Sequence, residues 1–116
     1  MIPDVPQKQF LKIILLSRQK EWLRKTCCDY HEDCVILINS GEYRGHAGAR
    51  RLADQLAREM PEAEFEYTTK LVSGRFAFLE WTGSSKTASV QDGADSFVIE
   101  NGKIVAQTIH YTLIAN

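Results

Sequence analysis

The chain has 116 residues, the size of one domain, and such a domain hides roughly two thirds of its unfolded surface. Its apolar fraction of 44% and charged fraction of 25% are those of an ordinary globular protein. The 14 basic and 15 acidic residues give a net charge of -1, so no overall field attracts nucleic acid or an anionic membrane. We therefore expect a single domain over residues 1–116, with neither of those among its partners.

Apolar runs such as 13–16 and 34–38 are far too short to span a bilayer. The start of the chain lacks the order of a signal peptide, because Asp4 precedes the apolar part and no small-residue cleavage site follows. The three cysteines cannot pair completely, which agrees with a reducing compartment. A cytoplasmic location is expected.

The first elements in chain order are helical. Apolar residues recur at helical spacing from about residue 5 to His31, and Ser17 is either a break between two helices or a polar position in one. A short β-branched strand is predicted over Cys34–Asn39, and Ser40-Gly41 turns it into residues 42–44.

Gly45 and His46 open the clearest helix of the sequence, and Pro61 ends it. One face of this helix is apolar and the other is charged. The expected buried residues are Ala49, Leu52, Ala53, Leu56 and Met60.

Strands make up the remainder. The side chains of segment 64–72 alternate between two faces of a predicted strand, with Phe65, Tyr67, Thr69 and Leu71 on one face. Asn101-Gly102 is a strong hairpin signal, because both central residues of a type I′ turn need positive φ. Further strands are predicted over 76–81, 87–100 and 103–114, separated by turns at 83–86 and 101–102. Helices followed by a mostly antiparallel sheet indicate an α+β domain.

Two segments carry a resemblance to a known family. They are Gly41-Glu42-Tyr43-Arg44-Gly45 before the central helix, and the strand and turn Gly93-Ala94-Asp95-Ser96-Phe97-Val98-Ile99-Glu100-Asn101-Gly102-Lys103-Ile104. With this order of elements, the chain resembles the SnoaL-like branch of the nuclear transport factor 2-like superfamily from about Trp22 onward. The resemblance implies a cone, in which N-terminal helices pack in a strongly curved, mixed but mostly antiparallel sheet and leave a ligand pocket. Gly93, in the middle of a long strand, suits such a bend.

The family contains isomerases, cyclases, dehydratases and hydrolases beside non-catalytic members. In its steroid isomerases, the counterpart of Asp95 is a protonated acid that donates a hydrogen bond to an oxyanion, a case that is also a general example of carboxyl tuning. The alternative for Asp95 is a hydrogen bond to neighbouring backbone or to an arginine. The isomerase base would fall near Ile38 or Asn39, where there is no carboxylate, and the helix tyrosine near Ile14 is missing. A steroid isomerase is therefore disfavoured.

The family pattern places Ala77, Leu79 and Trp81 inward, and on the last strand Gln107, Ile109 and Tyr111. Gln91, Phe97 and Ile99 share the face of Asp95 unless Gly93 bulges and resets the alternation. Asp95 and Tyr111 are the candidate catalytic residues, with core packing as the other interpretation of Tyr111 and Trp81. The candidate ligand-binding residues are Tyr43, Leu79, Trp81, Phe97 and Gln107.

The histidines are general-base candidates. His110 neighbours Tyr111 and should point to the opposite face, and His46 at a helix start suggests capping or solvent exposure. His31 lies among three cysteines, but no Cys-x-x-Cys pair exists. We expect no metal and no cofactor, and no phosphate loop or nucleophile elbow is present.

Two hypotheses follow. The first is binding of a small hydrophobic molecule in a cone-shaped pocket, with lyase or isomerase chemistry at Asp95, Tyr111 and Trp81 left open. The alternative is a non-catalytic binding or dimerisation module. A homodimer through the outer sheet face is expected, because that face is apolar where a one-layer sheet should be polar. Its predicted residues are Phe76, Phe78, Ala94, Ser96, Val98, Ile104, Ala106 and Thr108. The alternative is that a helix from the N-terminal region covers this apolar patch.

Overall fold

The structure is a computed structural model that describes residues 30–116. Over that part of the chain the protein forms one helix and seven strands. The helix α3 spans Gly45–Glu59. The strands are β1 Tyr30–Ile38, β2 Gly41–Arg44, β3 Glu64–Ser73, β4 Phe76–Ser84, β5 Ala88–Glu100, β6 Lys103–His110 and β7 Ile114–Ala115.

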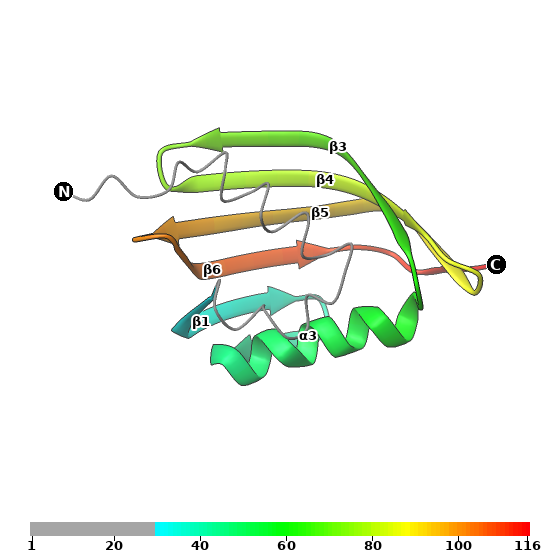
Figure 1. The fold of residues 1–116 in the computed structure, drawn as a ribbon, viewed down its shortest axis with the longest axis horizontal. Helices are drawn as coiled ribbons and strands as arrows, with labels where there is room; N and C mark the ends of the chain where they lie inside the picture. Colours follow the sequence, from blue (N-terminus) through cyan, green and yellow to red (C-terminus); the bar gives the residue numbers. More distant parts are fainter. Residues whose placement is uncertain (1–29) are drawn as a thin grey trace.

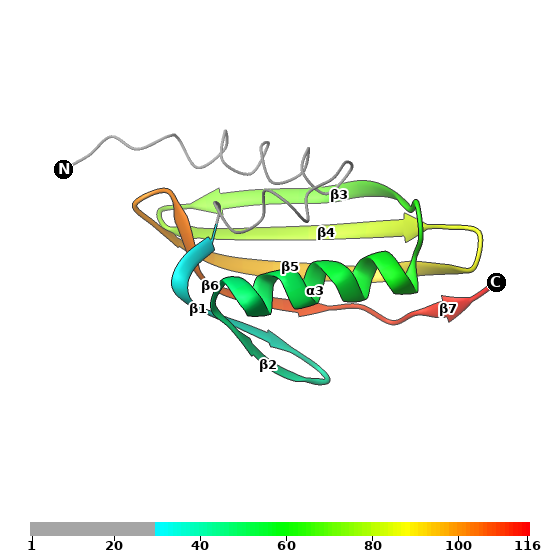
Figure 2. The ribbon, with the colours of Figure 1, turned by 60° about the horizontal axis from the view of Figure 1, so that its bottom comes forward.

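These strands form one sheet in the order β2-β1-β6-β5-β4-β3, with β7 paired to β5 near the end of the chain (Figure 1). The β1–β6 pair is parallel, and all the other pairs are antiparallel. The sheet is curved, and α3 lies along one of its faces (Figure 2). This arrangement confirms the predicted α+β fold with a curved, mixed and mostly antiparallel sheet.

The helix forms as its pattern predicts. Its buried residues include Ala49, Leu52, Ala53 and Leu56, and Met60 directly after it is 2% exposed. Residues at these spacings lie on one face of an α-helix, so the apolar stripe packs against the sheet. Asn101 and Gly102 adopt φ of 52° and 75°, which confirms the tight turn between β5 and β6.

The start of β1 differs from the expectation. Tyr30 and His31, predicted as the end of a helix, belong to a strand that pairs with β6 at Tyr30 and Ile104. Tyr30 is 3% exposed, so burial of its ring against the core overrides the local helical pattern. The rest of the predicted N-terminal helical region lies outside the described residues.

The β1–β6 pairing shifts register between Tyr30 and Val35. In addition, three single-residue bulges reset the alternation of β3, β5 and β6. Each inserts one extra residue, at Thr68 in β3, within 91–92 in β5 and at Val105 in β6. After a bulge, every later side chain changes face. Three expectations are thereby corrected: Leu71 is 59% exposed and lies on the outer face, Gln91 is exposed rather than beside Asp95, and Ile104 is fully buried.

The hydrophobic core lies between α3 and the face of the sheet that α3 covers, called here the inner face. Among its largest buried side chains are Trp81, Phe97, Ile36, Leu52 and Leu79. No helix within residues 30–116 is long and apolar enough to cross a membrane.

Candidate functional site

A buried carboxylate lies at the centre of the inner face. Asp95 is 1% exposed, and both of its oxygens accept hydrogen bonds from neighbouring strands. The Trp81 indole N–H on β4 donates to Oδ1 at 2.6 Å, and the Gln107 amide on β6 donates to Oδ2 at 2.8 Å. Asp95 itself pairs with Leu79 and Ile109, so both donors reach it diagonally across the sheet.

Gly93 makes the room that Trp81 needs. It pairs directly with Trp81 across the β4–β5 ladder. A Cβ atom at Gly93 would lie 2.3 Å from two carbons of the indole, which is far inside van der Waals contact. The absence of a side chain here lets the indole lie flat over β5 and direct its N–H toward Asp95.

The network continues from Gln107 to β1. The Tyr30 hydroxyl donates to Gln107 Oε1 at 2.5 Å, and this bond orients the Gln107 amide so that its NH₂ faces Asp95. The parallel β1–β6 pairing brings Tyr30 into reach although it lies 77 residues away in sequence. The resulting array is an acceptor surrounded by oriented donors, whereas the family resemblance implied a carboxyl that donates.

The structure brings together most of the predicted site residues. Leu79 and Phe97 are 0% and 2% exposed on the same face as Asp95, Trp81 and Gln107. The predicted inward registers of β4 and of the end of β6 are therefore confirmed. Their roles in binding or catalysis stay predictions.

Tyr111 has its ring and its hydroxyl in different surroundings. The ring lies 5.8 Å from the Trp81 ring between centroids, on the inner face. The hydroxyl donates to Glu59 Oε1 at 2.5 Å and accepts from Gln55 Nε2 at 3.2 Å. Burial, followed by the hydrogen bond to Glu59 and that group's charge, raises the pKa of Tyr111 well above its ordinary value of 10.0. Tyr111 therefore stays a neutral donor at physiological pH.

Two residues of this second network were missed from sequence. Gln55 and Glu59 stand four residues apart on α3, beside the buried stripe, and this spacing puts both on one side of the helix. Gln55 Oε1 accepts from the Tyr43 hydroxyl at 2.5 Å, and its amide reaches Glu59 Oε2 at 3.4 Å. The predicted ligand-binding residue Tyr43 is thus placed here and not beside Asp95. The only local signal was a polar pair at the edge of an apolar face.

A small cavity opens beside this second network. Its volume is about 300 Å³, and it lies between the C-terminal half of α3, the β1–β2 turn and the segment after β6. The cavity is lined by Asn39, Ser40, Gln55, Glu59, Tyr111, Thr112 and Leu113.

The histidines occupy other places. His110 is on the outer face, as predicted, with its side chain 62% exposed and Nε2 3.5 Å from Asp92. Two hydrogen bonds from Thr112 and the charge of His110 lower the pKa of Asp92. The same hydrogen bonds connect the β5 bulge to the segment that follows β6. His46 Nε2 lies 2.9 Å from the Tyr30 carbonyl oxygen, so this ring joins the start of α3 to β1.

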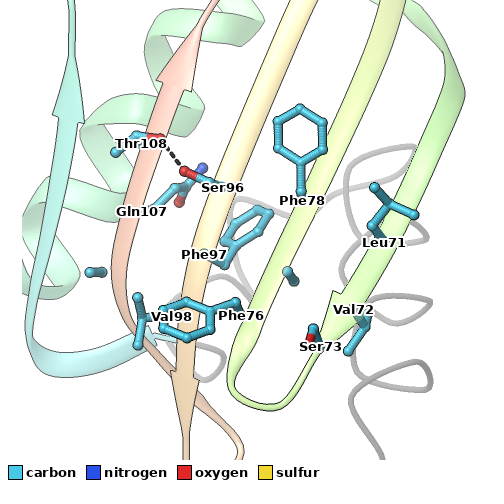
Figure 3. Close-up of a pocket in the computed structure, with 12 residues that line it drawn as sticks. Leu71, Val72, Ser73, Phe76, Phe78, Ser96, Phe97, Val98, Gln107 and Thr108 are labelled. Carbon is cyan, nitrogen blue, oxygen red and sulfur yellow. Dashed lines mark hydrogen bonds between the residues drawn. The ribbon is translucent and has the colours of Figure 1, made fainter.

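The outer face of the sheet carries an apolar hollow of about 640 Å³. Figure 3 shows Phe76, Phe78 and Leu71 projecting from β4 and β3 on this side, with α3 behind the sheet. Ser96 and Thr108 hydrogen-bond to each other at its edge. Phe76 is 54% exposed. The predicted apolar outer face is therefore present, with Leu71 added to it and Ile104 removed.

Sequence comparison identifies the family. Residues 27–107 match the model of the SnoaL-like domain, so the chain belongs to that family. Comparison with curated protein sequences finds no match.

Solved structures show the same fold at low identity. A nuclear transport factor 2-like protein of unknown function from Cytophaga hutchinsonii is 11% identical, with a TM-score of 0.74 over 97% of this chain and 95% of that one. A putative ketosteroid isomerase from Kribbella flavida is 14% identical, with a TM-score of 0.75 over 90% and 76%. A putative SnoaL-like polyketide cyclase from Shewanella putrefaciens is 10% identical, with a TM-score of 0.73 over 92% and 80%. These likenesses show the fold alone.

Proposed function

We propose that this chain binds a small hydrophobic molecule on the inner face of its curved sheet, with Asp95 as the polar anchor. The observation that carries the proposal is the buried array of Trp81, Asp95 and Gln107 within an otherwise apolar core. Burying a carboxylate costs several kcal/mol unless it is paired or hydrogen-bonded, and a few polar groups in an apolar site are what orient a bound small molecule.

The polarity of the array selects the ligand group. Asp95 accepts hydrogen bonds at both of its oxygens, and a carboxylate can only accept. A hydroxyl or N–H on the ligand suits such an acceptor, whereas a bare carbonyl does not. The role that the family's steroid isomerases give this position requires an O–H donor, whereas both oxygens of Asp95 accept hydrogen bonds in this structure. Binding is therefore the activity that we assign first.

The relatives agree with an apolar ligand class. Two of the similar structures are described as a putative ketosteroid isomerase and a putative polyketide cyclase, whose names point to ring compounds. The composition of the inner face favours the same class here, because Leu79, Phe97 and Trp81 are buried apolar residues on the face that carries Asp95.

Trp81 provides the test. The chain has two tryptophans, so Trp22→Phe leaves Trp81 as the single emitter, in hydrogen-bond contact with Asp95. We expect a saturable change in its fluorescence with 2-naphthol, which has one hydroxyl, and a weaker response to naphthalene, which has none. Asp95→Asn keeps the shape and should weaken 2-naphthol binding about tenfold, equivalent to about 1.4 kcal/mol.

Asp92→Asn is the matched control, because it removes an exposed aspartate from the same strand and should leave binding unchanged. Equal responses to 2-naphthol and naphthalene, or equal effects of the two aspartate variants, would contradict the assignment of Asp95 as anchor.

The outer face supports a second function, dimerisation with another copy of this chain. Phe76, Phe78 and Leu71 form an apolar hollow where a solvated sheet face should be polar.

A further inference from the structure

A second polar site lies around Glu59, separate from the contacts of Asp95. We propose that the cavity between α3, the β1–β2 turn and Thr112 binds a small alkylammonium group, with the Glu59 carboxylate as its counter-ion. The proposal rests on the hydrogen bonds, charge and size of this cavity and does not depend on ligand binding at Asp95.

The hydrogen bonds around Glu59 run in one direction. Tyr43 donates to Gln55, Gln55 donates to Tyr111 and to Glu59, and Tyr111 donates to Glu59. Glu59 is thus the terminal acceptor of the network. Two of the roughly four lone-pair sites of its carboxylate are used, one on each oxygen, so it can accept further hydrogen bonds on the cavity side.

Within the described part of the chain, residues 30–116, no cationic side chain forms an ion pair with Glu59. The ion pairs within residues 30–116 join Arg44 with Glu42, Arg75 with Glu100 and His110 with Asp92. The Arg51 guanidinium stacks over the Tyr43 ring of this network at 4.6 Å and forms no ion pair with Glu59. A half-buried carboxylate held by two donors is therefore left to pair with a cation from outside.

The shape and lining of the cavity set the size of the ligand. A volume of about 300 Å³ is at the lower end for small-molecule sites. Leu113 gives it an apolar wall, while Asn39, Ser40 and Thr112 supply polar groups at the opening. A primary ammonium on a chain of a few carbons fits both properties, with its N–H groups on Glu59 and its chain against Leu113.

The test titrates propylammonium chloride into the ¹⁵N-labelled full chain at pH 7, with 1-propanol as the neutral probe of similar size and potassium chloride as the ionic control. We expect saturable shifts of the Gln55 side-chain NH₂ and of the Ser40 and Thr112 amides with propylammonium only. Equal shifts with 1-propanol, shifts that do not saturate, or no shifts would overturn the proposal. This wild-type comparison is decisive even if a variant fails to fold.

Variants then locate the charge. Glu59→Gln keeps the shape and the hydrogen bond from Tyr111 but removes the charge, and should weaken propylammonium binding at least tenfold. Asp54→Asn removes an exposed carboxylate from the same helix and should leave binding within twofold of the wild type. Equal weakening in both variants would mean general electrostatic attraction and would overturn the site.

Discussion

The two faces of the sheet reverse the usual distribution of polarity. On the inner face, a carboxylate and an amide, Asp95 and Gln107, are each 1% exposed among apolar side chains. On the outer face, Phe76 and Leu71 are 54% and 59% exposed around an apolar hollow. In an ordinary fold, apolar side chains such as Phe76 and Leu71 are buried, and polar ones such as Asp95 and Gln107 are exposed.

Each reversal has its own physical explanation. Buried polar groups are tolerated when their hydrogen bonds are made, and those between Asp95, Trp81 and Gln107 are made within the sheet itself. Exposed apolar surface is tolerated when another molecule covers it. Our proposals assign a ligand to the inner face and a second copy of the chain to the outer face, so variants at each face should affect different measurements.

The largest expected effect comes from crowding the inner face. Gly93→Val places side-chain carbons against the Trp81 indole, where even a Cβ would lie at 2.3 Å. The indole must leave its position and with it the bond to Asp95, so we expect a loss of about 3 kcal/mol or more in the free energy of unfolding. Urea denaturation measures it. Ala94→Val, which enlarges the neighbouring residue on the opposite face, should cost less than about 1 kcal/mol.

Removing the Asp95 carboxylate should lower the free energy of unfolding somewhat less than Gly93→Val does. Asp95→Leu leaves the Trp81 N–H and the Gln107 amide buried without their acceptor, and we expect a loss of about 2–3 kcal/mol in the free energy of unfolding. Asp95→Asn still accepts from Trp81, and a reversed Gln107 amide can accept from it in turn, so its cost should stay below about 1.5 kcal/mol. Similar losses in the two variants, by urea denaturation, would show that the hydrogen bonds are not what stabilises the inner face.

Substitutions on the outer face should change the association of the chain with itself and leave its folding intact. Phe78→Glu places a charge in the apolar hollow, and we expect a dimeric wild type to become a folded monomer. Light scattering measures the mass, and circular dichroism checks the fold. Ile114→Glu changes another exposed apolar residue, on β7 and away from the hollow, and should leave the dimer intact. A wild type that is monomeric at high concentration would refute the proposed dimer.

The smallest effect concerns Tyr111, whose pKa is raised by burial and by Glu59. Because the folded-state pKa lies above the unfolded one, the folded state holds a proton that the unfolded state releases as the pH rises above about 10. The stabilisation is complete below that pH and decreases above it. Urea midpoints from pH 8 to 11 should therefore decrease more steeply in the wild type than in Tyr111→Phe; parallel curves would contradict the placement of the hydroxyl against Glu59.

Local sequence determined the elements of this protein. The apolar stripe of Gly45–Glu59, the Asn101-Gly102 turn and the long alternating runs are each signals within a few residues, because helix and strand periods are local properties. The family resemblance, combined with the alternation within each strand, also placed Trp81, Asp95 and Gln107 on one face, which indicated the inner site before its hydrogen bonds were known.

Tertiary structure decided the rest. A bulge adds one residue without a fixed sequence signature, so the faces of Leu71, Gln91 and Ile104 depended on pairings across the sheet. Tyr30 lies in a strand despite its helical sequence pattern, because it pairs with β6 and its hydroxyl hydrogen-bonds to the buried Gln107. The contact of Glu59 with Tyr111 joins residues 52 positions apart, and only the packing of α3 against the end of β6 brings that carboxylate and that hydroxyl together.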